Sequence, residues 1–157
     1  MKNNFYFILL TIFFLSSCAS FKTFSFTDED EIMDVFGNLN KTQSQLFIKS
    51  QEWLIKNFHQ ADHIIQFSDK EDGVMMGRYL LTSIPTYNLQ GEIISSRDIY
   101  AVIDIRVKDD KARISVLPQG NVSYRGNENT IKDQTEDQIN LLINDFGAYL
   151  GGSTVTF

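Results

Sequence analysis

Residues 98–117 read DIYAVIDIRVKDDKARISVL, and this stretch decides the fold. Apolar side chains occupy every second position from Ile99 to Val107, which is the period of a β-strand with one buried face. The polar run Lys108–Lys111 predicts a tight turn, and residues 112–117 predict a returning strand. Strands joined by so short a turn pair antiparallel, so the sheet is expected to grow from an antiparallel hairpin.

Two stretches with a helical period lie on either side of the predicted sheet. The first helix is expected from a capping-box pattern at Asn40 to about Phe58, and the second from a similar pattern at Thr135 to the glycine pair at 151–152. Each carries an apolar stripe that needs a partner surface. The two stripes hold Leu46, Phe47, Trp53, Leu54, Ile55 and Phe58, and Ile139, Leu142, Ile143, Phe146, Tyr149 and Leu150.

Further strands are predicted at 31–36, 62–67 and 74–84, the last of them ended by Pro85. Residues 86–97 are expected to form a long hairpin loop or an extension of the sheet. The order is then β-α-β-β-β-β-α. We therefore expect an α+β fold in which two amphipathic helices pack on one face of an antiparallel sheet of about four to five strands.

Composition limits the functions that this chain can have. Its 157 residues correspond to one domain, and its single cysteine excludes an intrachain disulfide and a cysteine-based metal cluster. A formal net charge of −6 and a pI near 4.8 argue against nucleic acid as a partner. No cofactor is expected.

The N-terminus has the pattern of an export signal. An apolar run at 5–15 follows Lys2 and is too short to span a bilayer, but it matches the length of a signal-peptide core. The next residues, L-S-S-C at 15–18, resemble the lipobox of bacterial lipoproteins. That resemblance implies cleavage between Ser17 and Cys18 and lipidation of Cys18 with acyl chains such as palmitate. The alternative is an ordinary secretory signal with a chance cysteine.

These features divide the chain into a signal peptide at 1–17, a lipidated N-terminus and tether at 18–30, and a single α+β domain at 31–157. Phe21, Phe24 and Phe26 leave the tether open to two other interpretations, because they could dip into the lipid headgroup region or belong to a first strand. The expected location is the cell envelope, on the periplasmic or cell-surface side of a membrane, with the outer membrane favoured. The membrane itself is a partner through the N-terminal lipid.

Three motifs resemble a family of uncharacterised bacterial lipoproteins described as having a TATA-box-binding-protein-like (TBP-like) fold. They are the helical motif at 51–54 with Phe58, the glycine-flanked strand start at 72–77, and the hairpin at 107–113. The resemblance covers roughly residues 31–117. It implies the same TBP-like α+β fold and no established activity, so no catalytic residue can be transferred. The acidic charge opposes DNA binding despite the name of the fold.

The sequence contains no catalytic or metal-binding pattern of convincing spacing, and we expect no enzymatic activity. His59 and His63 lie four residues apart, as zinc ligands on a helix do, but no third ligand accompanies them. The carboxylate pairs at 71–72 and 109–110 fall in predicted turns, where such residues are favoured for backbone reasons.

A candidate binding face is formed by Tyr100, Asp104 and Arg106 on the less apolar side of one strand, with Arg113 on its partner. The alternative is a solvated sheet face with cross-strand ion pairs. The expected function is a non-catalytic binding or envelope-structural module with an envelope protein or a glycan as partner. The second hypothesis is a carrier or sensor of a small apolar ligand held between helices and sheet.

Overall fold

The computed structural model describes residues 22–58, 64–87, 93–124, 128–151 and 153–154. Its main element is a six-stranded antiparallel sheet with the strand order β3-β4-β5-β6-β2-β8. A separate antiparallel pair is formed by β1 and β7. The strands are β1 (Lys22–Ser25), β2 (Ile32–Gly37), β3 (Ile65–Asp69), β4 (Val74–Tyr87), β5 (Ile93–Lys108), β6 (Lys111–Gln119), β7 (Asn121–Tyr124) and β8 (Ser153–Thr154).

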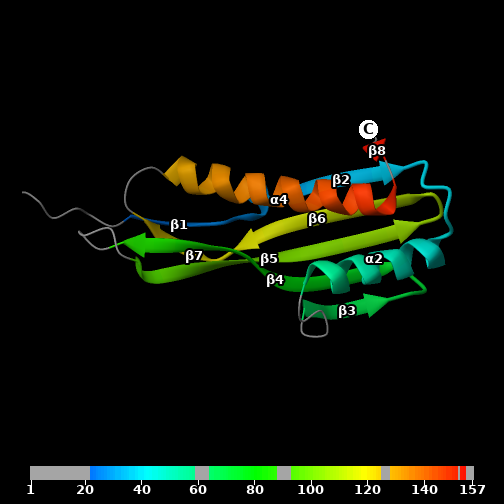
Figure 1. The fold of residues 1–157 in the computed structure, drawn as a ribbon, viewed down its shortest axis with the longest axis horizontal. Helices are drawn as coiled ribbons and strands as arrows, with labels where there is room; N and C mark the ends of the chain where they lie inside the picture. Colours follow the sequence, from blue (N-terminus) through cyan, green and yellow to red (C-terminus); the bar gives the residue numbers. More distant parts are fainter. Residues whose placement is uncertain (1–21, 59–63, 88–92, 125–127, 152, 155–157) are drawn as a thin grey trace, which may run out of the picture.

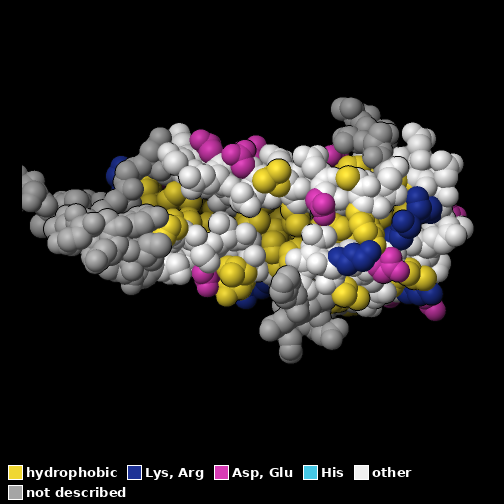
Figure 2. Space-filling model, viewed as in Figure 1, with side chains coloured by type: hydrophobic (Ala, Val, Ile, Leu, Met, Phe, Trp, Pro, Cys, Tyr) yellow, Lys and Arg dark blue, Asp and Glu magenta, His cyan; other side chains and the backbone are white. Residues whose placement is uncertain are grey.

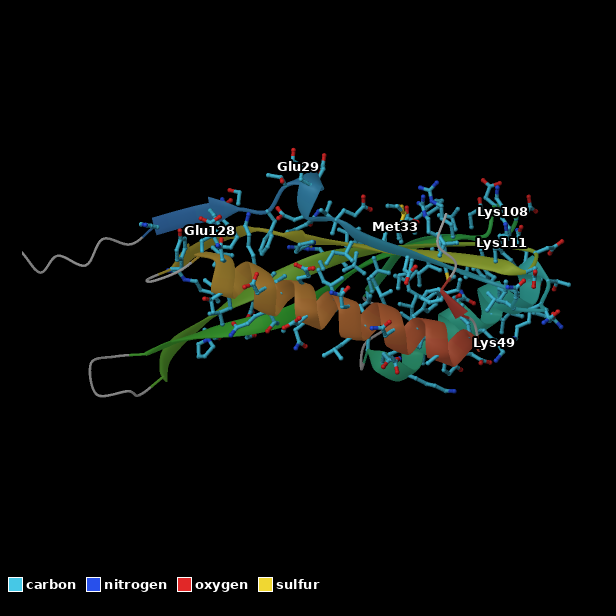
Figure 3. The ribbon with its side chains drawn as sticks, turned by 90° about the horizontal axis from the view of Figure 1, so that it is seen from above. Glu29, Met33, Lys49, Lys108, Lys111 and Glu128 are labelled. Carbon is cyan, nitrogen blue, oxygen red and sulfur yellow. The ribbon has the colours of Figure 1, made fainter. Side chains whose placement is uncertain are left out.

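Two helices, α2 (Gln43–Asn57) and α4 (Glu128–Leu150), lie on the same face of the main sheet (Figures 1 and 3). A 3-10 turn, η1 (Asp28–Asp30), connects β1 to β2. The predicted α+β class, with an antiparallel sheet and two helices on one face, is therefore confirmed. The short strands β1, β7 and β8 add to the predicted order.

The core lies between the helices and the inner face of the sheet. The alternating residues of β5 from Ile99 to Val107 point inward and are buried, as their period predicts. Trp53 of α2 packs edge-on against Phe146 of α4, with ring centroids 4.9 Å apart. The Trp53 indole N–H also donates to Asp145 over 2.7 Å, which joins the two helices. Figure 2 shows hydrophobic side chains of the layer beneath in the gap between α2 and α4.

Both helices begin at residues other than those predicted. The cap of α2 is Thr42, which forms its capping box with Gln45, so this helix begins after the predicted Asn40. The second helix begins at Glu128, and Thr135 lies inside it. The buried hydroxyl of Thr135 donates to the Ile131 carbonyl oxygen over 2.8 Å, a bond that a mid-helix threonine can make in place of capping. Within α2, Ile55 is 59% exposed and does not join the apolar face.

Pro85 does not end its strand, contrary to the prediction, and Pro118 likewise lies inside a strand. Pro85 lies within β4 opposite Ser96, and Pro118 lies within β6 opposite Ala101. At these positions each strand is paired on one side, because β3 pairs with β4 no further than Gly77 and β2 pairs with β6 no further than Val116. A proline is tolerated where its missing N–H faces away from the ladder. Of the two alternatives for 86–97, extension of the sheet is therefore correct for its described residues.

The described part of the predicted tether is structured. Strand β1 pairs with β7, and Phe24 is buried against Ile99, Val122 and Tyr124 in a second apolar cluster. The strand alternative is therefore the correct one for Phe24, and residues 22–30 pack on the domain. Residues 1–21 lie outside the described part of the chain.

Candidate functional site

The candidate site is the outer sheet face, defined here as the face of the main sheet opposite α2 and α4. Figure 3 shows Met33, Lys108 and Lys111 on this side of the sheet and Lys49 on the helix side. Because the strands pair in register, side chains on this face form rows that cross the sheet.

The first of these rows, the arginine row, contains Val35 of β2, Arg113 of β6, Arg106 of β5, Val74 of β4 and, at the β3 end, Asp69. The next row toward the middle of the sheet, the methionine row, contains Met33, Ser115, Asp104, Met76 and Phe67. The apolar members of these rows lie on both sides of the central charged residues. The outer sheet face therefore has a charged centre flanked by apolar side chains, with the Asp69 carboxylate beyond Val74 at the β3 edge.

The Asp104 carboxylate interacts with both arginines of the arginine row, by hydrogen bonds with Arg106 and by an ion pair with Arg113. Arg106 donates from Nε to both carboxylate oxygens over 3.1 Å and from Nη2 to Oδ2 over 2.9 Å. Arg113 Nη2 lies 3.6 Å from the same Oδ2. The hydrogen bonds with Asp104 raise the pKa of the Arg106 guanidinium, so Arg106 is charged at any physiological pH.

Arg106 and Arg113 are directly opposite each other on neighbouring strands, a placement in which like charges repel. The single carboxylate of Asp104 offsets one of these two charges. Arg113 Nε is buried and has no hydrogen-bond partner among the described residues. The cluster therefore keeps a net positive charge and at least one guanidinium N–H that is not satisfied within the described part of the chain.

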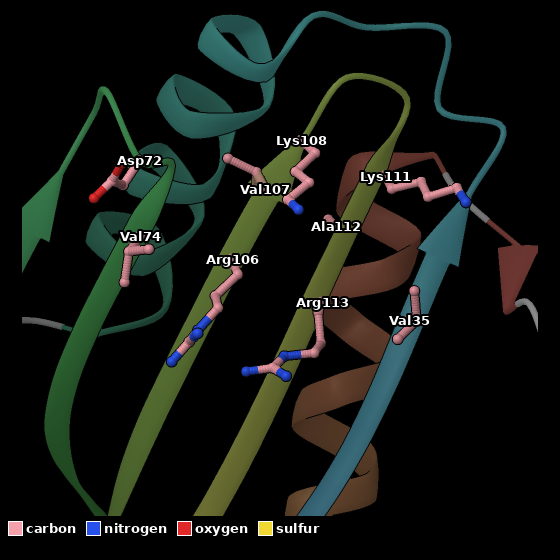
Figure 4. A pocket seen from close by; sticks show the side chains of 9 residues that line it. All are labelled: Val35, Asp72, Val74, Arg106, Val107, Lys108, Lys111, Ala112 and Arg113. Carbon is pink, nitrogen blue, oxygen red and sulfur yellow. The ribbon is translucent and has the colours of Figure 1, made fainter. Parts of the chain in front are cut away.

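A shallow depression of about 680 Å³ lies at the end of the outer sheet face that is nearest the β5–β6 hairpin (Figure 4). Four cationic residues and one carboxylate, Asp72, contribute to its lining. In Figure 4 the Arg106 and Arg113 side chains lie between Val74 on one side and Val35 on the other. The lining residues are Val35, Asp72, Val74, Arg106, Val107, Lys108, Lys111, Ala112 and Arg113.

Contacts with the first residue of α2 and with Asn40, just before the helix, hold the hairpin at this depression in place. The turn carboxylates of Asp109 and Asp110 accept the backbone N–H groups of Gln43 and Asn40 over 2.7 and 2.6 Å. A carboxylate near a helix N-terminus is stabilised by the unpaired N–H groups and the helix dipole. The predicted structural role of this carboxylate pair agrees with these contacts.

Several large apolar side chains of the outer sheet face are exposed. Met33 is 56% and Phe67 is 52% exposed, and Met76, Leu80 and Tyr100 also reach solvent. Arg78 lies over the Tyr100 ring, 4.5 Å from its centroid. Grouped exposed apolar side chains on a soluble domain commonly mark an interaction surface.

The structure places all four residues of the sequence-predicted face on the outer sheet face. It brings Asp104, Arg106 and Arg113 together, but Tyr100 lies two rows away from Asp104 along β5, beside Leu80. The contributions of other strands were missed. These residues are Met33, Val35, Phe67, Val74 and Met76, and only the strand register brings them beside the charged centre.

The other predicted sites lie largely outside the described residues. This is the case for Ser17, Cys18, His59 and His63. Within the described ranges, the structure has no group of three or more His, Cys, Asp or Glu side chains arranged to hold a metal ion. The helices described here include none with both the length and the apolar character needed to cross a membrane.

Comparison with known proteins gives a family and a fold. One solved structure, a DUF4468 family protein from Bacteroides ovatus, is 12% identical with a TM-score of 0.53, over 81% of this chain and 89% of that chain. A second, a TBP-like protein from Parabacteroides distasonis, is 14% identical with a TM-score of 0.55, over 77% and 92%. No curated protein matches. A family model described as "Domain of unknown function (DUF4468) with TBP-like fold" matches residues 35–125, more than half of the chain, and this protein therefore belongs to that family.

Proposed function

We propose that this protein is a lipid-tethered, non-catalytic binding module of the cell envelope, which docks a partner protein on its outer sheet face. The observation that carries the proposal is the group of exposed apolar side chains around the Arg106–Asp104–Arg113 cluster. The described helices cover the opposite face of the sheet. A face that combines apolar contact area with a charged centre has the composition of a recognition surface.

The chemistry of the charged centre favours recognition over catalysis. Guanidinium and ammonium groups stay protonated at neutral pH and donate hydrogen bonds without transferring protons. The Asp104 carboxylate is already engaged by both arginines, over 2.9 and 3.6 Å, rather than left open toward a reacting group. This is the basis on which we propose that the module is not an enzyme.

The shape of the domain suits a tether at its N-terminus. The described chain begins with β1 at one end of the long axis, and the β5–β6 hairpin lies at the other end (Figure 1). A lipid on Cys18 would hold the β1 end near the membrane. The depression beside the hairpin would then lie at the end of the domain far from the membrane, within reach of other envelope components.

The second hypothesis, a carrier or sensor that holds a small apolar ligand between the helices and the sheet, has less support in the described residues. Trp53 and Phe146 fill the space between the helices and the sheet. A depression of about 300 Å³ between β4 and α4 is lined by polar as well as apolar side chains, which suits an apolar ligand poorly.

The tether is tested by metabolic labelling with a palmitate analogue. We expect the wild-type protein to take up the label and the Cys18→Ala variant to take up none. An unlabelled wild-type protein that fractionates with the cytosol would contradict the tether.

The docking surface is tested by photo-crosslinking in intact cells. A photoreactive amino acid replaces Phe67 or Met33, at opposite ends of the methionine row, or Leu141 of α4 as a control that is 63% exposed. We expect both sheet positions to crosslink to the same protein, identified by mass spectrometry, and Leu141 not to crosslink to it. Equal crosslinking from Leu141, or none from the sheet positions, would refute docking on this face.

A further inference from the structure

We infer that the outer sheet face recognises carboxylate side chains within an apolar, extended segment of its partner protein, with the arginine row as the carboxylate subsite. This inference rests on the proposed docking function and names the chemistry of the partner.

The arginine row has hydrogen-bond donors that the domain itself does not use. A guanidinium has five N–H donors. Arg106 donates through Nε and Nη2 to Asp104, while Arg113 makes a single ion pair at 3.6 Å and its Nε has no partner in the described chain. The exposed guanidinium N–H groups of the two arginines border a depression of about 680 Å³ that Lys108 also lines. A planar carboxylate matches a guanidinium fork in geometry and in charge.

The apolar side chains that flank the arginine pair determine which other residues the partner segment needs beside its carboxylate. Val35 and Val74 lie in register on the two outer sides of the arginine pair, each about 4.8 Å from the neighbouring arginine strand. The methionine row lies two residues further along the strands, about 6.6 Å away. An extended peptide repeats its side chains on one face at the same spacing. A segment with an acidic residue followed two positions later by an apolar residue therefore fits both rows.

The charge distribution of the whole chain supports an acidic partner. The chain has a formal net charge of −6, but the depression is lined by four cations and one carboxylate. An acidic segment is repelled by most of the surface and attracted to this face, so electrostatics select both the partner and the docking site.

Other anions fit this face less well. Inorganic phosphate and acidic glycans lack apolar groups that could contact Val35, Val74 and the methionine row. Lipid headgroups do have apolar groups nearby. However, the arginine row lies toward the hairpin, at the end of the long axis away from β1 and the chain's N-terminal side (Figure 1).

The test measures binding of a fluorescent nine-residue peptide to the full chain in non-ionic detergent by fluorescence polarisation. Glu and Leu take turns at every second position of this peptide and Ser fills the positions between them, so that Glu and Leu share one face of the extended peptide. We expect the Arg106→Gln/Arg113→Gln variant to lose about tenfold in affinity, the sum of two exposed charge pairs. The matched control Lys49→Gln/Lys56→Gln makes the same charge change on the helix side and should bind as the wild type does. Arg106→Lys/Arg113→Lys keeps the charge without the fork and should bind with intermediate affinity.

Two further peptides separate charge from apolar contact. Replacement of Glu by Gln, or of Leu by Ser, should each abolish measurable binding. Equal binding of the Gln peptide, or an unchanged affinity of the Arg106→Gln/Arg113→Gln variant with native circular dichroism, would overturn the carboxylate subsite.

Competition at constant ionic strength distinguishes the source of the anion. Millimolar inorganic phosphate or glycerol phosphate should leave the peptide bound, and displacement by either would assign the row to phosphate and overturn the inference. If crosslinking from Phe67 and Met33 persists while peptide binding fails, the docking function stands and its carboxylate chemistry is wrong. If neither the crosslinking nor the peptide binding is observed, both the docking function and its carboxylate chemistry are refuted.

Discussion

Asp104 is the residue that makes the charged centre of the outer sheet face possible. Without it, Arg106 and Arg113 would be adjacent like charges on paired strands. With it, the two guanidinium groups are held side by side and still carry a net positive charge. One carboxylate thus converts an unfavourable pair into a pre-arranged donor surface.

Tyr79 is a second residue with unusual chemistry. Its side chain is buried beside the Phe58 ring, and its hydroxyl has no hydrogen-bond partner in the described structure. Burial raises the pKa of the Tyr79 hydroxyl above its usual value, because the phenolate would lose its hydration.

We expect Tyr79→Phe to stabilise the domain at neutral pH by about 1 kcal/mol, because it removes an unsatisfied buried group. Thr135→Val, which removes a hydroxyl that does have a partner, should instead lower the free energy of unfolding. Urea unfolding of the three proteins measures both changes. A destabilised Tyr79→Phe variant would show that the hydroxyl is satisfied.

The same substitution should change the pH dependence of stability. The folded-state pKa of Tyr79 lies above the unfolded value near 10, so its contribution is intact below pH 10 and is lost as the pH rises further. The free energy of unfolding of Tyr79→Phe, relative to that of the wild type, should therefore rise by about 1.4 kcal/mol per pH unit above pH 10. A difference in unfolding free energy that stays constant to pH 11 would contradict the raised pKa.

Asp110 has a strained backbone conformation, and its side chain accepts a hydrogen bond from another segment. Its φ of +66° lies in the left-handed region, and its carboxylate accepts the Asn40 N–H over 2.6 Å. Asp110→Ala should lower the free energy of unfolding by about 1–2 kcal/mol, because it keeps the strain and loses the bond. Asp110→Gly loses the bond but relaxes the backbone, so it should cost less. Thermal unfolding compares the two variants. Equal losses of unfolding free energy in Asp110→Ala and Asp110→Gly would exclude backbone strain at this position.

At the scale of secondary-structure elements, α4 depends on a close approach to the sheet. Gly147 is buried, and a Cβ at this position would overlap the ring of Phe36 in β2. The Phe36 ring cannot move freely because it packs edge-on against Phe146, with centroids 6.0 Å apart. The helix therefore reaches β2 through a position that has no side chain.

Gly147→Ala should lower the free energy of unfolding by about 1–3 kcal/mol through overpacking, although alanine is the better helix former. The exposed neighbour Ala148 provides the control, since Ala148→Gly should cost about 1 kcal/mol from helix propensity alone. Chemical denaturation measures both. A stabilising Gly147→Ala would mean that propensity outweighs the contact with Phe36.

At the scale of the whole molecule, the two ends of the sheet have different supports. The β5–β6 hairpin is held by the N-terminus of α2, and the opposite end is closed by β1 and β7. Phe24 connects β1 to the domain through Ile99 and Tyr124. Strand β1, where the described chain begins, is thus part of the packing of the domain.

Phe24→Ala should lower the free energy of unfolding by about 3 kcal/mol, as for other buried aromatic side chains. Phe67→Ala on the outer sheet face, where the side chain is 52% exposed, should cost less than about 0.5 kcal/mol. Differential scanning calorimetry compares the two. Equal stability of Phe24→Ala and wild type would mean that β1 does not contribute to the folded domain.

The sequence alone determined the elements whose signal lies in a local period. The alternation from Ile99 to Val107 and the helical stripes around Trp53 and Phe146 identify the α+β class and most of the core, because period and burial are linked within one element. The hairpin turn at 108–111 was predictable for the same reason.

Only the tertiary structure decided which strands are neighbours. The helical start at Glu128 and the continuation of β4 past Pro85 depend on contacts with distant segments, which a local pattern does not contain. The same applies to the site. The sequence placed Asp104 and Arg106 on one face, but cross-strand register set Arg113 beside them and set Val35 and Val74 on either side, because register is fixed by the packing of the whole sheet.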